Sequence, residues 1–358
     1  MTTRLHNFSA GPGVLPLSVL EEVKAELPVF SDAGASVMEI SHRSAQYTRV
    51  AESAVERFRR LLGLTDDWHV LFLQGGASMQ FYQVPLNFLP HGGSAAYVNT
   101  GVWATKAIEQ ASTLGTVHVV ASSKDTGFDR IPDVASWEST ADHAYTHITT
   151  NNTIYGTQFQ DDPTADNPLV ADVSSDFVSR PMNLNGYSLL YAGAQKNLGP
   201  AGVTVVFVRD AFLKTRNAGL PKILDYATHT ATLYNTPPVF AVYVVEKVLA
   251  WIESEGGLDA MAVRNRDKAG LIYDRIDASD FYRGASHRDS RSLMNITFRL
   301  PTEELETRFI AEAKSEGLVS LKGHRSVGGI RASVYNACPM DSARALARFM
   351  AEFERTNG

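Results

Sequence analysis

The segment YAGAQKNLGPAG, residues 191–202, places a single lysine, Lys196, among small and turn-forming residues. A lysine used in covalent chemistry must lose its proton to attack a carbonyl carbon, and it then forms an imine with a substrate or with pyridoxal phosphate. Small neighbours would let a bulky cofactor approach the backbone. Because an arbitrary loop lysine is more often only solvated, the interpretation of Lys196 depends on what surrounds it in the fold.

Short apolar runs rich in Val, Ile, Leu and Tyr recur through the first 210 residues and predict strands, several of them separated by helical patterns at 77–88 and 102–114. Continuously apolar strands interleaved with helices indicate an α/β fold with a mainly parallel sheet covered on both faces. Ligands of such sheets bind at the carboxyl ends of the strands. The predicted strands are 69–73, 95–98, 117–121, 144–149, 168–172, 188–192 and 203–208.

The pattern changes beyond about residue 240. A long amphipathic stretch is followed by the short apolar runs LMNITFRL, GLVSL and GIRASVYN and by helical patterns near 303–315 and 340–355, which is an α+β arrangement. We therefore predict a large cofactor-binding α/β domain over residues 15–245. A smaller α+β domain is predicted over residues 246–358, joined by residues 1–14.

Composition limits the classes of protein. The chain has 358 residues, 44% of them hydrophobic, no apolar stretch long enough to span a membrane, and an opening segment without the apolar run of a secretory signal. Its single cysteine, Cys338, cannot form an intrachain disulfide, and its net charge of −6 argues against nucleic acid as a partner. We expect a cytoplasmic protein that binds neither membranes nor nucleic acid.

Two features strengthen the interpretation of Lys196. Asp172 ends the run LVAD, and Lys196 follows the next apolar run. Pyridoxal phosphate needs both groups, an amine for the imine and a carboxylate that keeps its pyridine nitrogen protonated. In addition, Gly75 and Gly76 stand between a strand and a helix, where free backbone N–H groups can bind a phosphate. Alone, Asp172 is more often a helix cap and the glycine pair an ordinary turn.

Two more polar or aromatic residues follow predicted strands. Trp103, in GVWA, could stack on a pyridine ring, and Thr153, in NNTIYG, could form a hydrogen bond with the phenolic oxygen of that ring. By themselves they are more often a core residue and a turn residue.

Taken together, these motifs resemble the class V, fold-type I pyridoxal-phosphate aminotransferases, and within that family the phosphoserine aminotransferases. The resemblance covers essentially the whole chain. Its motifs are SAGPG (9–13), SHRS (41–44), QGGAS (74–78), GVWA (101–104), ADVSSDFVSRP (171–181), YAGAQKNLGPAG (191–202), YNTPP (234–238) and KGHRSVGGIRASVYNA (322–337).

The resemblance implies a role for each site residue. Lys196 would form the imine and Asp172 would face the pyridine nitrogen, so both would be catalytic. Asn235 and Thr236 would reach the cofactor phosphate of the neighbouring subunit, which implies a homodimer with shared active sites. No metal is expected. The implied cofactor-binding set is Gly76, Ala77, Trp103, Thr153, Asp172, Gln195, Lys196, Asn235 and Thr236.

For the substrate, the resemblance points to His42, Arg43, His324, Arg325 and Arg331. Guanidinium groups bind carboxylates and phosphates through paired hydrogen bonds. We expect Arg331 to bind the carboxylate, and His324 and Arg325 to favour the phosphate. This chain departs from the pattern at one position: some relatives have an arginine directly after the glycine pair, whereas this chain has Ala77.

The implied reaction transfers an amino group from L-glutamate to 3-phosphohydroxypyruvate, giving O-phospho-L-serine and 2-oxoglutarate in serine biosynthesis. Formation of 4-phosphohydroxythreonine in pyridoxine biosynthesis stays open. One alternative is another class V enzyme, such as an alanine–glyoxylate aminotransferase. A cysteine desulfurase is disfavoured because Cys338 ends a predicted strand rather than lying in a flexible loop. The remaining alternative is a non-catalytic module that binds a phosphorylated ligand at the glycine pair.

Overall fold

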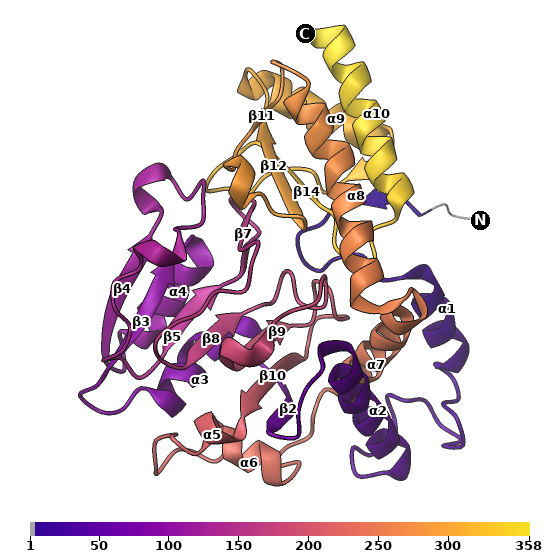
Figure 1. Cartoon of the computed structure of the whole chain (residues 1–358). Helices are drawn as coiled ribbons and strands as arrows, with labels where there is room; N and C mark the ends of the chain where they lie inside the picture. The colour runs from indigo at the N-terminus through magenta and orange to yellow at the C-terminus, as the bar shows by residue number, and fades with distance from the viewer. Residues whose placement is uncertain (1–3) are drawn as a thin grey trace.

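The computed structural model describes residues 4–358, and its centre is a seven-stranded sheet with the strand order β2-β10-β9-β8-β5-β3-β4 (Figure 1). All seven predicted strands form, and the prediction of a mainly parallel sheet is confirmed. β10 runs antiparallel to both of its neighbours. The strands are β2 (Trp68–Leu73), β3 (Ser94–Asn99), β4 (Thr116–Ser122), β5 (Thr146–Thr149), β8 (Leu169–Asp172), β9 (Tyr187–Gly193) and β10 (Thr204–Arg209).

Helices cover both faces of this sheet. Side chains of α1 (Leu17–Glu26), α2 (Ala45–Leu62) and α7 (Val239–Ser254) pack on one face, and those of α3 (Gly76–Phe88) and α4 (Val102–Ala111) pack on the other. Successive side chains of a strand point to opposite faces. Val205 and Phe207 of β10 therefore belong to the first core, and Val206 and Val208 to the second. Burial on both faces explains why the strands are continuously apolar.

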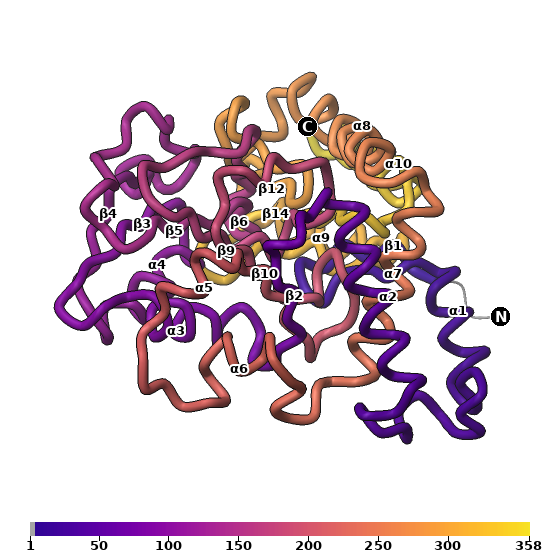
Figure 2. The backbone as a smooth tube through the Cα atoms, turned by 60° about the horizontal axis from the view of Figure 1, so that its bottom comes forward, coloured from indigo at the N-terminus to yellow at the C-terminus, as the bar shows by residue number. Residues whose placement is uncertain are grey.

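The C-terminal part of the chain builds a separate core. It contains α8 (Gly257–Asp277), α9 (Glu303–Ser315), α10 (Met340–Asn357) and a small antiparallel sheet of β11 (Arg283–Gly284), β12 (Asn295–Arg299) and β14 (Ile330–Ser333). α8 and α10 lie side by side (Figure 2). The N-terminal β1 (His6–Asn7) pairs with β13 (Leu318–Val319), and Phe8 is buried in this core.

The proposed domains are 15–245 and 246–358 with 1–14, of which residues 1–3 lie outside the described part of the chain. Their boundary falls inside α7, whose Val248, Leu249 and Ile252 still pack in the core of the large sheet. The boundary itself stays a proposal. The remaining elements are the short strands β6 (Asn151–Asn152) and β7 (Thr157–Gln158), the helices α5 (Asp210–Leu213) and α6 (Tyr226–Ala231), and single 3₁₀ turns at Lys124–Thr126, Val134–Ser136, Leu184–Gly186 and Arg288–Ser290.

A buried polar network ties the large sheet to the small one. Asn151 Nδ2 donates to Ser175 Oγ and to Asn295 Oδ1, both at 2.8 Å, and Asn295 Nδ2 donates to Ser333 Oγ at 2.8 Å. Buried polar groups with satisfied hydrogen bonds specify one arrangement of the parts that they join. The network therefore fixes β14, which carries Arg331, against the strand ends of the large sheet.

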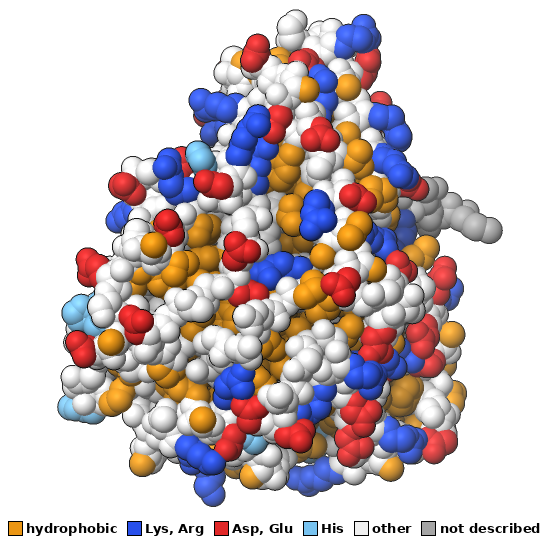
Figure 3. Space-filling view, viewed as in Figure 1, with side chains coloured by type: hydrophobic (Ala, Val, Ile, Leu, Met, Phe, Trp, Pro, Cys, Tyr) orange, Lys and Arg blue, Asp and Glu red, His pale blue; other side chains and the backbone are white. Residues whose placement is uncertain are grey.

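The surface carries charges of both signs. On the face shown in Figure 3, acidic and basic side chains are intermixed rather than gathered into one field of a single sign. Among residues 4–358, no helix combines the length and the apolar character that crossing a membrane requires.

Candidate active site

A cavity of about 420 Å³ opens at the carboxyl ends of β8 and β9, between the first turns of α3 and α4 and the C-terminal sheet. It brings together nine of the site residues that the sequence predicts. These are Gly76, Ala77, Trp103, Thr153, Asp172, Gln195, Lys196, His324 and Arg331.

Lys196 lies in the loop that joins β9 to β10, and backbone hydrogen bonds hold this loop in place. The N–H of Ala194 donates to Val203 O at 3.1 Å, and the N–H of Gly199 donates to Ala194 O at 2.8 Å. The Asn336 N–H donates to Asn197 Oδ1 at 3.0 Å, which ties the loop to the C-terminal region. Burial lowers the pKa of Lys196, although the nearby Asp172 opposes the shift. A lowered pKa favours the neutral amine, the form that acts as a nucleophile or base.

Asp172 is the last residue of β8, and its side chain is oriented by Ser174. Oδ1 of Asp172 accepts hydrogen bonds from the Ser174 N–H at 3.0 Å and from Ser174 Oγ at 2.6 Å. Burial raises the pKa of Asp172, against the opposing effects of Lys196 and of Ser174. Asp172 and Lys196 line the same cavity and form no ion pair with each other, so both groups face the space that a ligand would occupy.

The first turn of α3 offers an anion site. Gly75 precedes the helix with φ of 94°, no side chain caps the first N–H groups, and Gly76, Ala77 and Ser78 line the cavity. A Cβ atom at position 75 would lie 2.6 Å from Met79 Cβ, so glycine is required there. Uncapped N–H groups together with the helix dipole fit a phosphate group.

Trp103, from the first turn of α4, forms one wall of the cavity. Its indole Nε1–H donates to Thr153 Oγ1 at 3.0 Å, which leaves the hydroxyl hydrogen of Thr153 available to a ligand. The Lys196 Nζ atom lies 5.6 Å from the centroid of the Trp103 ring. The indole, the hydroxyl and the amine therefore surround one volume, as the ring of pyridoxal phosphate would require.

The small residues around Lys196 serve mainly packing, so the expectation that they make room for a cofactor is only partly correct. Ala201 lines the cavity. A Cβ atom at Gly199 would instead lie 3.1 Å from Val245 Cγ2 of α7, which shows that this glycine lets the loop approach the helix. Small lining residues also come from other segments, such as Ala10 and Gly11 from the N-terminal segment and Gly76 and Ala77 from α3.

Five predicted site residues lie outside the cavity of their own chain. Asn235 Nδ2 donates to Gln74 Oε1, and Thr236 O accepts from Gln74 Nε2, both at 2.8 Å. His42 and Arg43 precede α2, and Arg325 is exposed in a separate groove.

Sequence reasoning assigned no role to several other residues of the cavity. Most of these residues lie in the motifs SAGPG, QGGAS and ADVSSDFVSRP, and this is the sequence feature that could have pointed to them. They are Ala10, Gly11, Pro12, Ser78, Phe81, Ser174 and Ala201.

A second lysine, Lys268, is fully buried, and burial lowers its pKa to about 7. Judged by its lowered pKa alone, Lys268 would be a second candidate for the lysine that binds the cofactor. Its Nζ, however, donates to the backbone oxygens of Val334 at 2.9 Å and Tyr335 at 2.6 Å, and it does not line the cavity. Lys268 therefore binds the chain after β14, and only Lys196 is placed to bind a ligand covalently.

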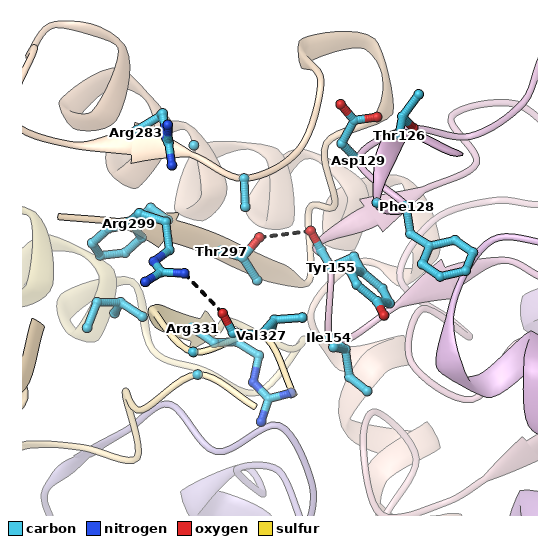
Figure 4. Close-up of a pocket in the computed structure, with 17 residues that line it drawn as sticks. Thr126, Phe128, Asp129, Ile154, Tyr155, Arg283, Thr297, Arg299, Val327 and Arg331 are labelled. Atoms are coloured by element: carbon cyan, nitrogen blue, oxygen red, sulfur yellow. Dashed lines mark hydrogen bonds between the residues drawn. The ribbon is translucent and has the colours of Figure 1, made fainter. Parts of the chain in front are cut away.

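A neighbouring cavity of about 320 Å³ shares Arg331 with the first (Figure 4). Arg331 is half-buried and donates from Nη1 to Thr153 O at 3.0 Å. Its guanidinium extends away from the second cavity, whereas Arg299 points across it to Val327 O. Arg331 has no acidic partner among residues 4–358, so it can bind a carboxylate in the cavity of Lys196.

Comparison with known proteins agrees with this geometry. The model of the family described as aminotransferase class-V matches residues 5–346. This chain belongs to the class V aminotransferases. Pyridoxal phosphate is therefore its cofactor, and the free N–H groups of α3, the indole and the Asp172–Lys196 pair fit it.

Similar proteins within this family are named phosphoserine aminotransferase. The phosphoserine aminotransferase of Desulfosudis oleivorans is 54% identical over 100% of both chains. The solved structure of phosphoserine aminotransferase from Bacillus circulans subsp. alkalophilus has 50% identity and a TM-score of 0.97 over 100% of both chains. The PLP-bound phosphoserine aminotransferase of Trichomonas vaginalis has 36% identity and a TM-score of 0.92, with 97% of this chain and 100% of that chain covered. The chain thus lies in the phosphoserine branch of the family.

Proposed function

We propose that this aminotransferase transfers the amino group of L-glutamate to 3-phosphohydroxypyruvate, giving O-phospho-L-serine and 2-oxoglutarate. The observation that carries the proposal is one cavity that holds the Asp172–Lys196 pair, an anion site on α3 and the basic groups of His324 and Arg331. Full-length similarity to proteins named phosphoserine aminotransferase supports it. We also propose a cytoplasmic location, which fits the single cysteine.

We assign the cofactor contacts as follows. The N–H groups of Gly76 and Ala77 would hold the cofactor phosphate, together with Gln195. Thr153 would donate its free hydroxyl hydrogen to the phenolic oxygen, and the indole of Trp103 would stack on the ring. Asp172 would accept a hydrogen bond from the protonated pyridine nitrogen, because Ser174 donates both of its hydrogen bonds to Oδ1 and leaves Oδ2 available.

When bound, pyridoxal phosphate supplies an aldehyde carbon and an electron-withdrawing ring that accepts the electrons of a broken Cα–H bond. Lys196 would have two roles: its amine would hold the cofactor, and as a free amine it would take the proton from the substrate Cα onto Nζ. Asp172 would keep the ring nitrogen protonated. Arg331 orients the Cα–H bond by holding the α-carboxylate of each substrate.

The proposal predicts a strong preference for the phosphorylated keto acid. Basic groups that bind a phosphate through charge-assisted hydrogen bonds contribute roughly 2–5 kcal/mol, which is about 30-fold to several thousand-fold in kcat/KM. We expect kcat/KM for 3-phosphohydroxypyruvate to exceed that for hydroxypyruvate by such a factor in a coupled assay with glutamate. Equal turnover of the two keto acids would instead favour a small-substrate enzyme, such as an alanine–glyoxylate aminotransferase.

We further propose a homodimer in which Asn235 and Thr236 complete the partner's site. Within their own chain they lie beside a groove lined by Met79 and Ile223, whose side chains are 40% and 45% exposed. Exposed apolar side chains that border predicted cofactor contacts fit a surface that a second copy covers.

Co-expression of two inactive variants tests this sharing. Lys196→Ala subunits and Asn235→Ala/Thr236→Ala subunits should form hybrid dimers in which one site keeps every native residue. With random pairing of equal amounts, about one quarter of the native activity should return. Hybrid dimers isolated with two different tags that show no gain over either parent would contradict the shared site.

A further inference from the structure

Lys106 lies beside the candidate active site, although sequence reasoning gave it no role. It follows Trp103 by three residues on α4, so the two side chains share one face of the helix. Its Nζ atom lies 4.9 Å from the centroid of the Trp103 ring, and Lys196 Nζ lies 5.6 Å from the same ring. Lys106 does not itself line the cavity, but it packs against the wall residue Trp103 and its side chain is exposed, so we place it at the outer edge of this wall, beside the cavity's mouth.

Lys106 belongs to a group of basic side chains without acidic partners. Burial lowers the pKa of His324, and the positive charges of Arg331, Arg325 and Lys106 lower it further, so each of these three groups lies within Coulombic range of His324. None of the four forms an ion pair with an Asp or Glu side chain in the part of the chain that the structure describes. Gathered positive charge that no carboxylate neutralises favours binding of a multiply charged anion.

The dimensions of the proposed substrate place its phosphate near this group. Three bonds separate Cα from phosphorus in O-phospho-L-serine, which is about 4 Å at ordinary bond lengths. With Cα beside Lys196 Nζ and the carboxylate on Arg331, the phosphate extends toward the mouth of the cavity. A lysine on a flexible four-carbon stem can reach it there.

The first turn of α3 supplies backbone N–H groups and no cationic side chain, and the proposed function gives these N–H groups to the cofactor phosphate. Cations for the substrate phosphate must therefore come from other elements. A phosphate monoester carries a charge of about −1.5 to −2 near neutral pH. A charge-assisted hydrogen bond to such a group is stronger than an exposed cation–π contact, so Lys106 would leave the indole when the substrate binds.

We propose that Lys106 is a specificity-determining residue whose ammonium group binds the substrate phosphate, together with His324. This inference rests on the proposed function, because it requires a phosphorylated substrate.

The test compares two keto acids in Lys106→Met holoenzyme. kcat/KM for 3-phosphohydroxypyruvate should fall about 10- to 100-fold, whereas kcat/KM for hydroxypyruvate, which has no phosphate, should change less than about 2-fold. Raising the ionic strength should reduce the preference of the native enzyme for 3-phosphohydroxypyruvate over hydroxypyruvate. Titration of the visible absorption band should show the same loss of affinity for O-phospho-L-serine and none for L-serine.

Three further variants serve as controls. Lys106→Arg keeps the charge and should retain most of the preference. Lys314→Met removes an exposed lysine of α9 that has no acidic partner among residues 4–358 and should change neither keto acid. Arg331→Ala should lower kcat/KM for both keto acids, since each has an α-carboxylate.

The outcomes separate this inference from the proposed function. If Lys106→Met lowers kcat/KM equally for both keto acids, or for neither, Lys106 does not bind the phosphate and the inference is wrong. If the native enzyme itself does not prefer the phosphorylated keto acid, the proposed function fails first, whatever the variant does.

Discussion

Replacing Lys196 by alanine is expected to lower transamination by about 10⁴-fold or more, the upper end of what one positioned general base contributes. The variant loses both the covalent attachment of pyridoxal phosphate and the base that removes the Cα proton. The other buried lysine, Lys268, cannot substitute, because it donates its hydrogen bonds to backbone oxygens outside the cavity. The measurement is kcat at saturating glutamate and 3-phosphohydroxypyruvate, together with the visible absorption of the purified protein.

Lys268→Met is the matched control for this result. Removing a buried lysine that binds three consecutive carbonyl groups should lower the melting temperature, but the protein should keep its covalently bound cofactor. The assignment of Lys196 fails if the Lys196→Ala enzyme keeps more than about 1% of the native kcat, because general-base catalysis alone exceeds that factor.

The second large effect is expected for Asp172→Asn. The amide has the same shape as the carboxylate but no charge, so the ring nitrogen loses the partner that keeps it protonated. Removing one member of a buried charge pair costs roughly 3–5 kcal/mol. We expect kcat to fall by about 10²-fold to several thousand-fold while the cofactor stays attached to Lys196.

Ser174→Ala gives a graded comparison with Asp172→Asn. It removes the hydroxyl bond to Asp172 but leaves the bond from the Ser174 N–H, so its effect on kcat should be smaller, about 10-fold. Rapid-scanning absorption of the glutamate half-reaction measures both variants. If Asp172→Asn reacts at the native rate, the proposed role of the Asp172 carboxylate is wrong.

The strands and helices with buried faces were predictable because their apolar pattern is local in the sequence. The run 203–208 forms β10 (Thr204–Arg209), and the helical pattern 303–315 forms α9. Strand direction was not predictable, since a strand buried on both faces has the same pattern in either orientation, and β10 is antiparallel. The pattern 102–114 extends past the end of α4 at Ala111, where the hydroxyls of Ser112 and Thr113 bond back to the helix carbonyls.

The cofactor side of the cavity could be predicted because its residues follow strand ends or carry specific motifs. Lys106 could not, because three-residue spacing on a helix is common and only the packed ring of Trp103 gives it meaning. The packing role of Gly199 depends on Val245, a residue distant in sequence. Contacts of this kind appear only in the folded chain.

A crystal structure of the holoenzyme tests the central claim most directly. The account predicts a covalent link between the cofactor and Lys196 Nζ, with the pyridine nitrogen at hydrogen-bond distance, roughly 2.7–3.2 Å, from the carboxylate of Asp172. A cofactor linked to another lysine, or a ring whose nitrogen faces away from Asp172, would contradict it.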